Sequence, residues 1–336
     1  MRLFSRRTGL ALVVVAGGYL AARSWETLRH APWPELASTP AAPAPAGSDA
    51  PGGWVDGNDL VRRVVGAVEG RPNIAARFRH AVRVGDELLS GSGQYWQQGR
   101  GNTRRTCWQW TALVAGQTAA FSQILDKNGC VWTDVRLPER RTVTRVDANR
   151  VRRDVEAALA GQGRGVAESA TLELLARGGL AQTLAELQRS FHFAPPVAVT
   201  VEGHDALALV GQWRDELLGR RWPGAVGASG AQWPAPLPHH VLLVVGARDF
   251  FPYVIEYRRG ADETWASTPH ASPDPLARFE FYAVDFAAAM REEMFEFRAN
   301  DVQWRDATSL MVQRLLPRAA PAPQVQTAAG SAPWRQ

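Results

Sequence analysis

The stretch Arg105–Leu137, RTCWQWTALVAGQTAAFSQILDKNGCVWTDVRL, decides the fold class of this chain. Apolar and polar residues alternate through it with a period of two, which is the pattern of strands that bury one face. Strands are therefore expected over Arg105–Val114, Gln117–Leu125 and Cys130–Leu137. Short strands separated by close turns predict an antiparallel meander.

A two-residue turn at Ala115–Gly116 sets the register of the first hairpin and places Trp110 opposite Phe121. Side chains then sort onto two faces, of which one is more polar and the other is rich in aromatic and aliphatic groups. The apolar face is expected to carry Trp108, Trp110, Ala112, Phe121, Leu125 and Trp132. An aromatic face is usually ordinary core, so this pattern alone leaves open whether the face packs on the protein or holds a ligand.

A second two-residue turn at Asn128–Gly129 places Leu125 opposite Trp132. Cys107 and Cys130 then fall on strands separated by a third strand, about 9–10 Å apart, and on opposite faces. A disulfide needs Cα atoms within about 7 Å. Although the compartment favours disulfides, the expectation is no disulfide and two buried free thiols.

Strands and helices continue on both sides of this stretch. A helix that begins at an Asn58 cap and ends at Gly70 is expected first, followed by strands over Ala76–Val84 and Leu88–Gln98. After the meander the pattern predicts a further strand at Arg140–Asp147 and helices at Asp147–Ala160 and Glu168–Ser190. It then predicts strands at Val197–Glu202 and Ala206–Trp213, a hairpin over His239–Gly260 and a strand at Ala277–Phe286.

About three helices must cover ten or more strands, and this imbalance determines the fold class. A strongly curved sheet with so much apolar inner surface must close on itself or hold something. The chain is thus expected to be mainly β with helices (α+β). The architecture would be an incomplete antiparallel β-barrel or strongly curved sheet capped by a few α-helices.

The N-terminal segment, residues 1–30, has the layout of an export signal, with three arginines before an uncharged run at Thr8–Ala22. The cleavage site is poor, because Leu20 or Tyr19 would occupy the −3 position. A cleaved signal and an uncleaved signal anchor both stay open, and the anchor is favoured. Residues 31–53 form a Pro/Ala-rich linker, residues 54–316 the folded domain, and residues 317–336 a disordered tail. The domain is expected in the periplasm or cell envelope.

Composition and motifs exclude several classes of function. The net charge of +5 comes from scattered arginines, since Lys127 is the single lysine, and no nucleic-acid-binding stripe is present. The chain has no H-E-x-x-H, no G-x-S-x-G and no phosphate loop. His239 and His240 begin a strand and point to opposite faces, so they do not form a metal site. No enzyme activity, cofactor or metal is expected.

Six segments, taken in order, resemble a known family. They are DLVRRVVGAVEG (59–70), IAARFRHAVRVGDELLSGSGQYWQQG (74–99), RRTCWQWT (104–111), SQILDKNGCVWTDV (122–135), HHVLLVVGARDFFPYVIEY (239–257) and RFEFYAVDFAAAMREEMFEFRAND (278–301). The chain resembles the LolA-like periplasmic lipoprotein carriers, with the related LolB, LppX and RseB folds. The last of these segments looks like the closing strand of that family with its F-x-F ending, Phe295–Phe297.

The resemblance implies a half-barrel with an apolar cavity for acyl chains and a lid made by the helices of Glu168–Ser190. Carriers of this type use an arginine after the first strand pair to latch barrel to lid, and Arg100 is the nearest match. The cavity-lining residues are expected to be Trp96, Trp108, Trp110, Phe121, Leu125, Trp132, Phe279 and Phe281.

Two functions follow from this resemblance. In the first, the protein is a non-enzymatic envelope binding protein whose partner is a lipid or lipoprotein acyl chain. In the second, it is an RseB-like sensor or scaffold with a filled core, tethered to the inner membrane by its N-terminal segment, which binds an envelope protein and no lipid. The Pro/Ala-rich linker favours a tethered role, because a carrier that shuttles between membranes must be free.

Overall fold

The computed structural model describes residues 56–84, 87–114, 117–138, 140–160, 179–201, 203–222, 237–258, 275–298 and 302–316, with residues 225 and 233. The expected N-terminal segment, linker and C-terminal tail lie outside the described residues. The same holds for the turn at Ala115–Gly116 and for residues 168–178, the first part of the expected lid.

The strands form a 13-stranded sheet whose order along the path differs from the order in the sequence. Along the path the strands are β13 (Trp304–Asp306), β6 (Arg140–Asp147), β5 (Cys130–Leu137), β4 (Gln117–Leu125), β3 (Arg105–Val114), β2 (Glu87–Gln98), β1 (Asn73–Val84), β12 (Pro275–Asp285), β11 (Pro252–Arg258), β10 (His240–Gly246), β9 (His204–Trp213) and β7 (Phe191–Phe193). β8 (Val197–Val201) pairs with β9 off this path. All pairings are antiparallel except that of β13 with β6.

The predicted meander is confirmed, and β3, β4, β5 and β6 have the expected bounds. The first hairpin has the predicted register, because Trp110 pairs with Phe121. The register of the second hairpin is wrong by one residue, since Trp132 pairs with Ile124 and Leu125 pairs with Val131. A shift of one residue moves every side chain of a strand to the other face. Trp132 therefore lies on the face opposite Trp110.

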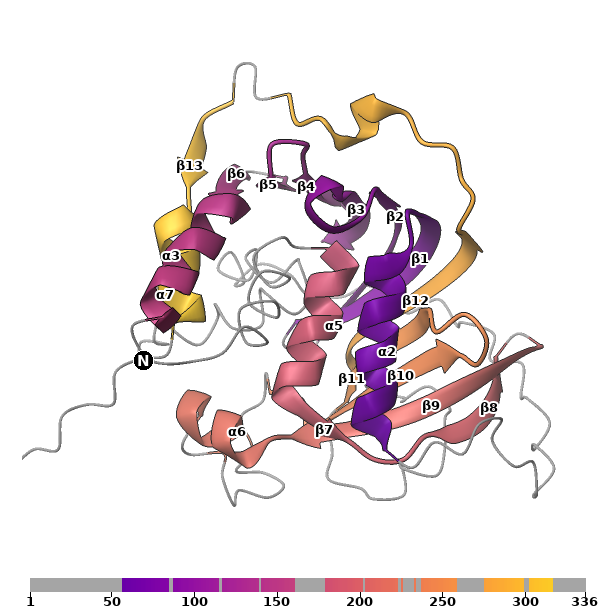
Figure 1. The fold of residues 1–336 in the computed structure, drawn as a ribbon. Helices are drawn as coiled ribbons and strands as arrows, with labels where there is room; N and C mark the ends of the chain where they lie inside the picture. Colours follow the sequence, from indigo (N-terminus) through magenta and orange to yellow (C-terminus); the bar gives the residue numbers. More distant parts are fainter. Residues whose placement is uncertain are drawn as a thin grey trace, which may run out of the picture.

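The sheet curves around two helices, and this confirms the expected fold class of a curved sheet capped by helices (Figure 1). α2 (Gly57–Gly70) and α5 (Gly179–Ser190) lie side by side inside the curve, while α3 (Ala148–Ala160) and α7 (Thr308–Leu315) pack together near β6. The short α6 (Asp215–Arg221) follows β9. Among the described helices, none has the length and apolar character needed to span a membrane.

The N-cap of helix α2 lies two residues before the expected one, Asn58. The side chain of Asp56 accepts a hydrogen bond from the backbone N–H of Asn58 at 2.8 Å, so Asp56 is the N-cap. Asn58 instead contacts His192 and accepts from the backbone N–H of Phe193, which ties the start of the helix to β7. The buried face of the helix consists of Leu60, Val61, Val64, Val65 and Val68, at the i, i+3 and i+4 spacing of an amphipathic helix.

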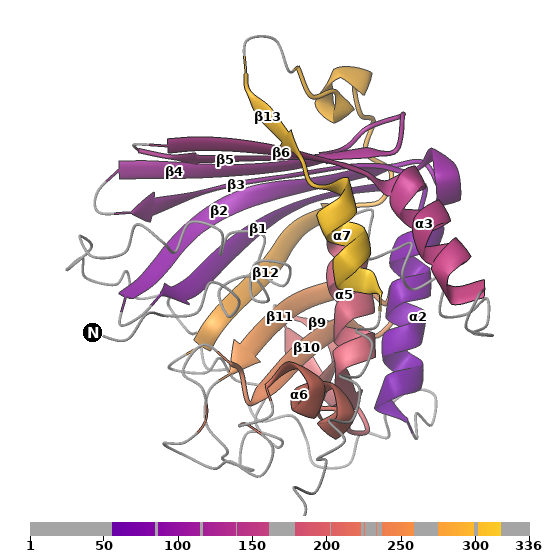
Figure 2. The ribbon, with the colours of Figure 1, turned by 90° about the vertical axis from the view of Figure 1, so that its left-hand side faces the viewer.

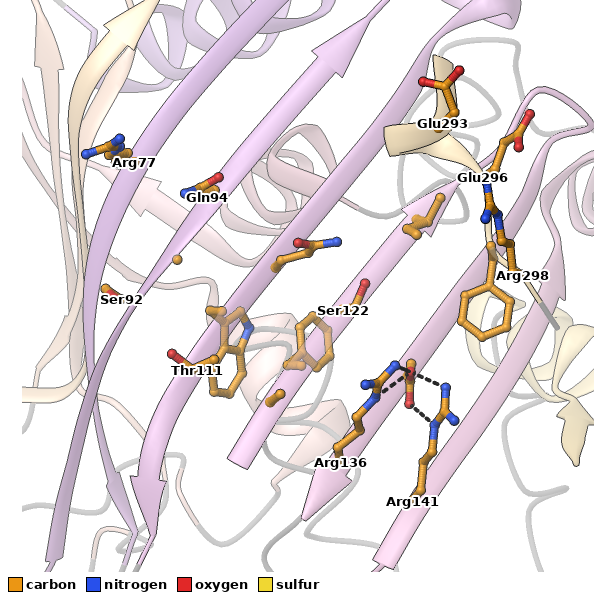
Figure 3. Close-up of a pocket in the computed structure, with 18 of the residues that line it drawn as sticks. Arg77, Ser92, Gln94, Thr111, Ser122, Arg136, Arg141, Glu293, Glu296 and Arg298 are labelled. Atoms are coloured by element: carbon orange, nitrogen blue, oxygen red, sulfur yellow. Dashed lines mark hydrogen bonds and ion pairs between the residues drawn. The ribbon is translucent and has the colours of Figure 1, made fainter. Parts of the chain in front are cut away.

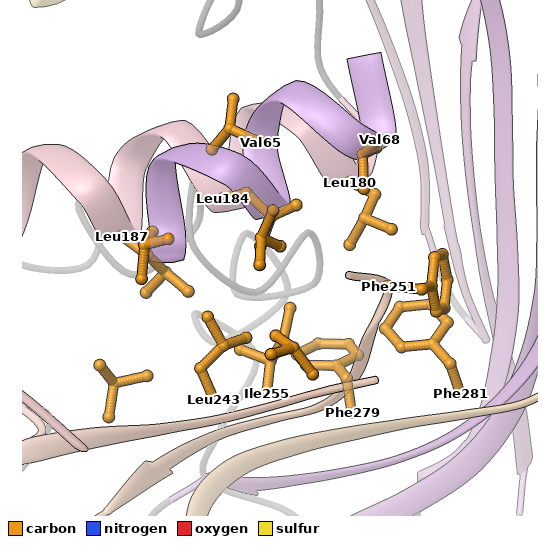
Figure 4. Packing of buried hydrophobic residues seen from close by; sticks show 14 of the residues in the cluster. Val65, Val68, Leu180, Leu184, Leu187, Leu243, Phe251, Ile255, Phe279 and Phe281 are labelled. Carbon is orange, nitrogen blue, oxygen red and sulfur yellow. The ribbon is translucent and has the colours of Figure 1, made fainter. Parts of the chain in front are cut away.

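The largest core cluster fills the space between these two helices and the concave face of the sheet (Figure 4). Leu180, Leu184 and Leu187 of α5 are at most 1% exposed. They belong to one cluster with Leu243 and Ile255 of the strands. Under the helices, the concave face is thus packed as core.

Two glycines in the middle of β2 let side chains of β1 cross over that strand. A Cβ atom built on Gly93 would lie 2.3 Å from Cζ of Phe78 and 2.4 Å from the carbonyl oxygen of Gln109. At Gly91 a Cβ atom would lie 2.6 Å from Nε2 of His80. Real Cβ atoms do not approach this closely, so both positions require glycine for packing, and the side chains from β1 occupy the space above β2.

We expect Gly93→Ala to destabilise the fold by about 1–3 kcal/mol, because the added methyl group overpacks the sheet against Phe78. Gly66→Ala is the matched control: Gly66 lies on the exposed side of α2, and a Cβ atom there meets nothing within 4 Å. That control should stabilise the helix by about 0.5–1 kcal/mol. Chemical denaturation measures both, and equal effects would contradict this account of β2.

Candidate functional site

The half of the sheet that extends beyond the helices is the first candidate site. Strands β1 to β6 run on past α2 and α5 (Figure 2). By the strand register, the concave face of this extension carries apolar side chains, which we call the concave apolar surface: Val82, Leu89, Trp110, Ala112, Ala119, Phe121 and Val135. Trp110 stacks on Phe121 with ring centroids 5.1 Å apart. The surface continues without a break into the core under the helices through Phe78 and Phe279.

Six of the eight expected lining residues lie on the concave face. Trp108 contacts the rings of Phe78, Phe279 and Phe281, with centroids 5.7–6.4 Å apart. Trp110 and Phe121 belong to the concave apolar surface, whereas Leu125 packs on α3 in a separate cluster. A role for these six in holding a ligand stays a prediction.

The other two expected lining residues, Trp96 and Trp132, lie on the convex face. Trp96 packs in a cluster with Cys107 and Phe295. Trp132 stacks on Phe297, with centroids 4.8 Å apart, and its indole N–H donates to Asp126. The expectation that Trp132 shares a face with Trp108 is wrong, because the second hairpin shifts by one residue.

His80 is the titratable group at the centre of the concave face. It is 4% exposed and lies between the rings of Trp110 and Phe279. Its Nε2 atom lies 3.0 Å from the carbonyl oxygen of Thr111, which it reaches across Gly91. Burial lowers the pKa of His80 to about 4, because a charged imidazolium is poorly solvated here. The imidazole is therefore neutral at physiological pH.

An arginine does link the sheet to a helix, but it is Arg104. Its side chain is 1% exposed and forms an ion pair with Glu69 in the last turn of α2. Gln97 of β2 adds two hydrogen bonds to the carbonyl oxygens of Val68 and Arg71, at 2.7 and 3.1 Å. Arg100, the residue expected from the resemblance, is exposed on the turn after β2, where its backbone contacts Thr103.

The convex face holds the second candidate site, a groove of about 910 Å³ (Figure 3). Its floor is a row of polar side chains on six adjacent strands: Tyr282, Arg77, Gln94, Gln109, Ser122 and Asp134. Along one side runs the segment Phe286–Arg298, which we call the C-terminal strap. The strap buries Phe295 against Cys107 and Ile124 of the sheet. The first part of the expected closing segment forms the strand β12, whereas its F-x-F ending, Phe295–Phe297, follows the start of a short 3₁₀ turn at Glu292–Phe295 and covers the sheet.

Two arginines and one carboxylate form the charged end of this groove. Asp134 is 2% exposed and accepts from Nε and Nη2 of both Arg136 and Arg141, at 2.8–3.0 Å (Figure 3). Burial alone would raise the pKa of Asp134, but these hydrogen bonds outweigh it, and the pKa lies below its usual value. Two guanidinium groups on one carboxylate leave a net positive charge that suits an anionic partner.

The pKa of Asp134 is lower in the folded than in the unfolded protein, so its negative charge stabilises the fold. This stabilisation is fully present at pH values above the unfolded-state pKa, near 3.9, and is lost as the pH falls through the folded-state pKa. Asp134→Asn should therefore cost about 1–3 kcal/mol at pH 7, and the difference from wild type should shrink below about pH 4. Urea unfolding at pH 7 and pH 3 measures this. Asp154→Asn, in an exposed pair on α3, is the control and should change little at either pH. A pH-independent cost at Asp134 would contradict the assignment.

Neither cysteine offers a reactive thiolate. Both are free and buried, as expected. Burial raises the pKa of Cys107 to about 12, and burial together with Asp126 raises that of Cys130. The argument that they point to opposite faces is wrong, because Cys107 and Trp132 align across β4 and Cys130 shares the face of Trp132. The intervening strand still separates them. Within the described ranges, no group of three or more His, Cys, Asp or Glu side chains is arranged to hold a metal ion.

The sequence matches no protein-family model and no curated protein. Among solved structures, the Pseudomonas aeruginosa MucA/MucB complex is similar at 12% identity and a TM-score of 0.35, over 72% of this chain and 61% of that chain. The Mycobacterium tuberculosis lipoprotein LppX is similar at 9% identity and 0.31, over 67% and 91%. A LolA superfamily protein from Nitrosomonas europaea is similar at 11% identity and 0.25, over 72% and 98%.

The match spans less than two thirds of the MucB chain. These similar structures include members of the LolA-like group that the sequence resembles.

Proposed function

We propose that this protein is a non-enzymatic binding protein of the cell envelope that holds an acyl chain of a lipid or lipoprotein on its concave apolar surface. One observation carries the proposal: the curved sheet extends past its covering helices, and the concave face of the extension is apolar. The resemblance to lipoprotein carriers agrees with this assignment.

Burial of an acyl chain on this surface supplies enough free energy for binding. At about 25 cal/mol per Å² of apolar area, one long chain contributes several kcal/mol. Trp110 and Phe121 form a rigid stacked pair, so little side-chain entropy is lost when a chain packs against them. The surface is therefore suited to reversible binding.

The ionisable groups near the surface favour binding over catalysis. His80 is neutral and fixed to a backbone carbonyl, and burial raises the pKa of the Tyr95 phenol well above its usual value. A general acid or base needs a pKa near the working pH. Neither group meets that condition.

The envelope location and the N-terminal tether belong to the same proposal. The arginine-rich start followed by an uncharged run supports export, and the linker gives the domain reach from the inner membrane. N-terminal sequencing of the mature protein tests this: an intact Met1 supports the anchor, and a start beyond residue 22 excludes it.

Displacement of the fluorescent probe N-phenyl-1-naphthylamine tests the binding function. The full chain should take up the probe and release it when a triacylated lipopeptide or palmitic acid is added. Release should saturate at about one ligand per chain. A chain that takes up neither probe nor ligand while correctly folded would exclude the proposed function.

A protein partner is the second candidate, favoured by the groove on the convex face. Arg136 and Arg141 are held in place by Asp134, and their remaining N–H groups face the groove side of the sheet. Such a pair would bind a carboxylate of an acidic peptide segment. Capture of an envelope protein by wild type, and its loss in Arg136→Ala/Arg141→Ala with acyl binding intact, would favour this function.

A further inference from the structure

Two buried polar atoms on the concave face have no hydrogen-bond partner, although their neighbours do. The hydroxyl of Tyr95 donates to Gln97 at 2.8 Å, and Gln97 in turn donates to the end of α2. By contrast, Nδ1 of His80 and Nε1 of Trp108 are buried, and among the described residues neither has a partner. Buried polar atoms in proteins are almost always paired, so each exception requires an explanation.

The tautomer of His80 follows from its one hydrogen bond. Nε2 lies 3.0 Å from the carbonyl oxygen of Thr111, and a carbonyl oxygen only accepts. Nε2 must therefore carry the hydrogen and donate it. In a neutral imidazole the other nitrogen then has a lone pair, so Nδ1 is an acceptor that is left without a donor.

Trp108 has the complementary need. An indole N–H only donates, and that of Trp108 is buried without an acceptor. The residue is 9% exposed and lies on the same face as His80, two strands away on β3, where it pairs with Tyr95 of β2.

The two rings border one aromatic cluster. His80 stacks on Phe279 with centroids 6.3 Å apart, and Trp108 meets the edge of the same ring at 6.0 Å. Both also contact Phe78, at 6.1 and 5.7 Å. One unpaired acceptor and one unpaired donor thus lie around the same two phenyl rings, in surroundings that are otherwise apolar.

We propose that His80 and Trp108 select the ligand, and that the bound acyl chain carries a group that both donates and accepts a hydrogen bond, such as an amide or a hydroxyl. This inference rests on the proposed function, because it places the group on an acyl ligand of the concave face. A plain hydrocarbon or a simple ester leaves at least one of the two ring atoms unpaired. N-acylated and hydroxylated acyl chains satisfy both.

The test compares two probes of equal chain length, dodecanamide and 1-chlorododecane, by displacement of N-phenyl-1-naphthylamine from the full chain. Removing an amide from water is unfavourable in any apolar site, so the informative quantity is the affinity ratio of the probes in wild type and variants. His80→Phe and Trp108→Phe keep an aromatic ring and remove the acceptor or the donor. Each should lower the affinity for dodecanamide about tenfold relative to that for 1-chlorododecane.

The outcomes separate this inference from the proposed function. If both probes bind and their ratio is the same in wild type and both variants, the selection by His80 and Trp108 is wrong while acyl binding stands. If neither probe binds folded wild type, the proposed function itself fails.

A measurement on wild type covers the case in which a variant does not fold. The ¹⁵N resonance of His80 Nδ1 should shift when dodecanamide is added and stay in place with 1-chlorododecane. A resonance that does not respond to the amide would overturn the proposal.

Discussion

Arg104→Ala should destabilise the fold by about 3–5 kcal/mol, because it breaks a buried ion pair. The side chain is 1% exposed and pairs with Glu69 at the end of α2. Truncation removes the partner of a half-buried carboxylate and leaves a cavity between helix and sheet. Glu69 is then left with a desolvated charge whose main compensation is gone.

Urea unfolding of the full chain measures this cost, and two further variants make the result specific. Arg104→Met/Glu69→Leu replaces the pair by apolar groups of similar length and should recover much of the lost stability. Arg100→Ala, four residues away on the exposed turn, should change stability by less than about 0.5 kcal/mol. A larger cost at Arg100 than at Arg104 would show that the link between sheet and helix has been misassigned.

Trp110→Glu should weaken acyl binding by at least about tenfold, because it places a carboxylate where the chain would pack. Trp110 is only partly buried; at the edge of the core it stacks on Phe121 and meets the ring of His80 edge-on. The substitution should therefore alter the ligand surface more than the fold. Probe displacement measures the affinity, and circular dichroism reports whether the sheet is intact.

Thr111→Glu is the matched control for this variant. It introduces the same charge one residue along β3, where the side chain points to the opposite, exposed face. Acyl binding should be unchanged in Thr111→Glu. Equal losses in the two variants would mean that the charge acts through stability or through the convex groove, and would contradict a site on the concave face.

The sheet was largely predictable from sequence because its signal is local. Alternating residues gave the bounds of β3 to β6, and the close turn between β3 and β4 gave their pairing. The register set by the next turn was predicted wrongly, because one side chain lengthens that turn. Asp126 accepts from the backbone N–H groups of Asn128 and Cys130, and Gly129 has φ +75°, so the turn is longer than two residues. That extra residue moved Trp132 to the convex face.

The remaining features depend on contacts between distant segments, which periodicity does not report. Nothing local indicates that Phe295 returns to cover Cys107, or that Trp304 starts a strand parallel to β6. The ion pair between sheet and helix also depends on distant segments. Arg100 and Arg104 are four positions apart, and only the path of α2 decides which of them meets Glu69. The sequence did carry one signal for this ion pair. Glu69 lies at the end of an amphipathic helix that precedes the expected sheet, and its carboxylate requires a cationic partner.

Photo-crosslinking with a palmitic acid that carries a diazirine near the end of its chain tests the central claim most directly. On β3, even-numbered residues face the concave side and odd-numbered residues the convex side. Peptide mapping of the labelled full chain should place the label on Trp108, Trp110 and Ala112, and excess unlabelled palmitic acid should remove it. Label on Gln109, Thr111 or the C-terminal strap, or no competable label at all, would contradict an acyl site on the concave face.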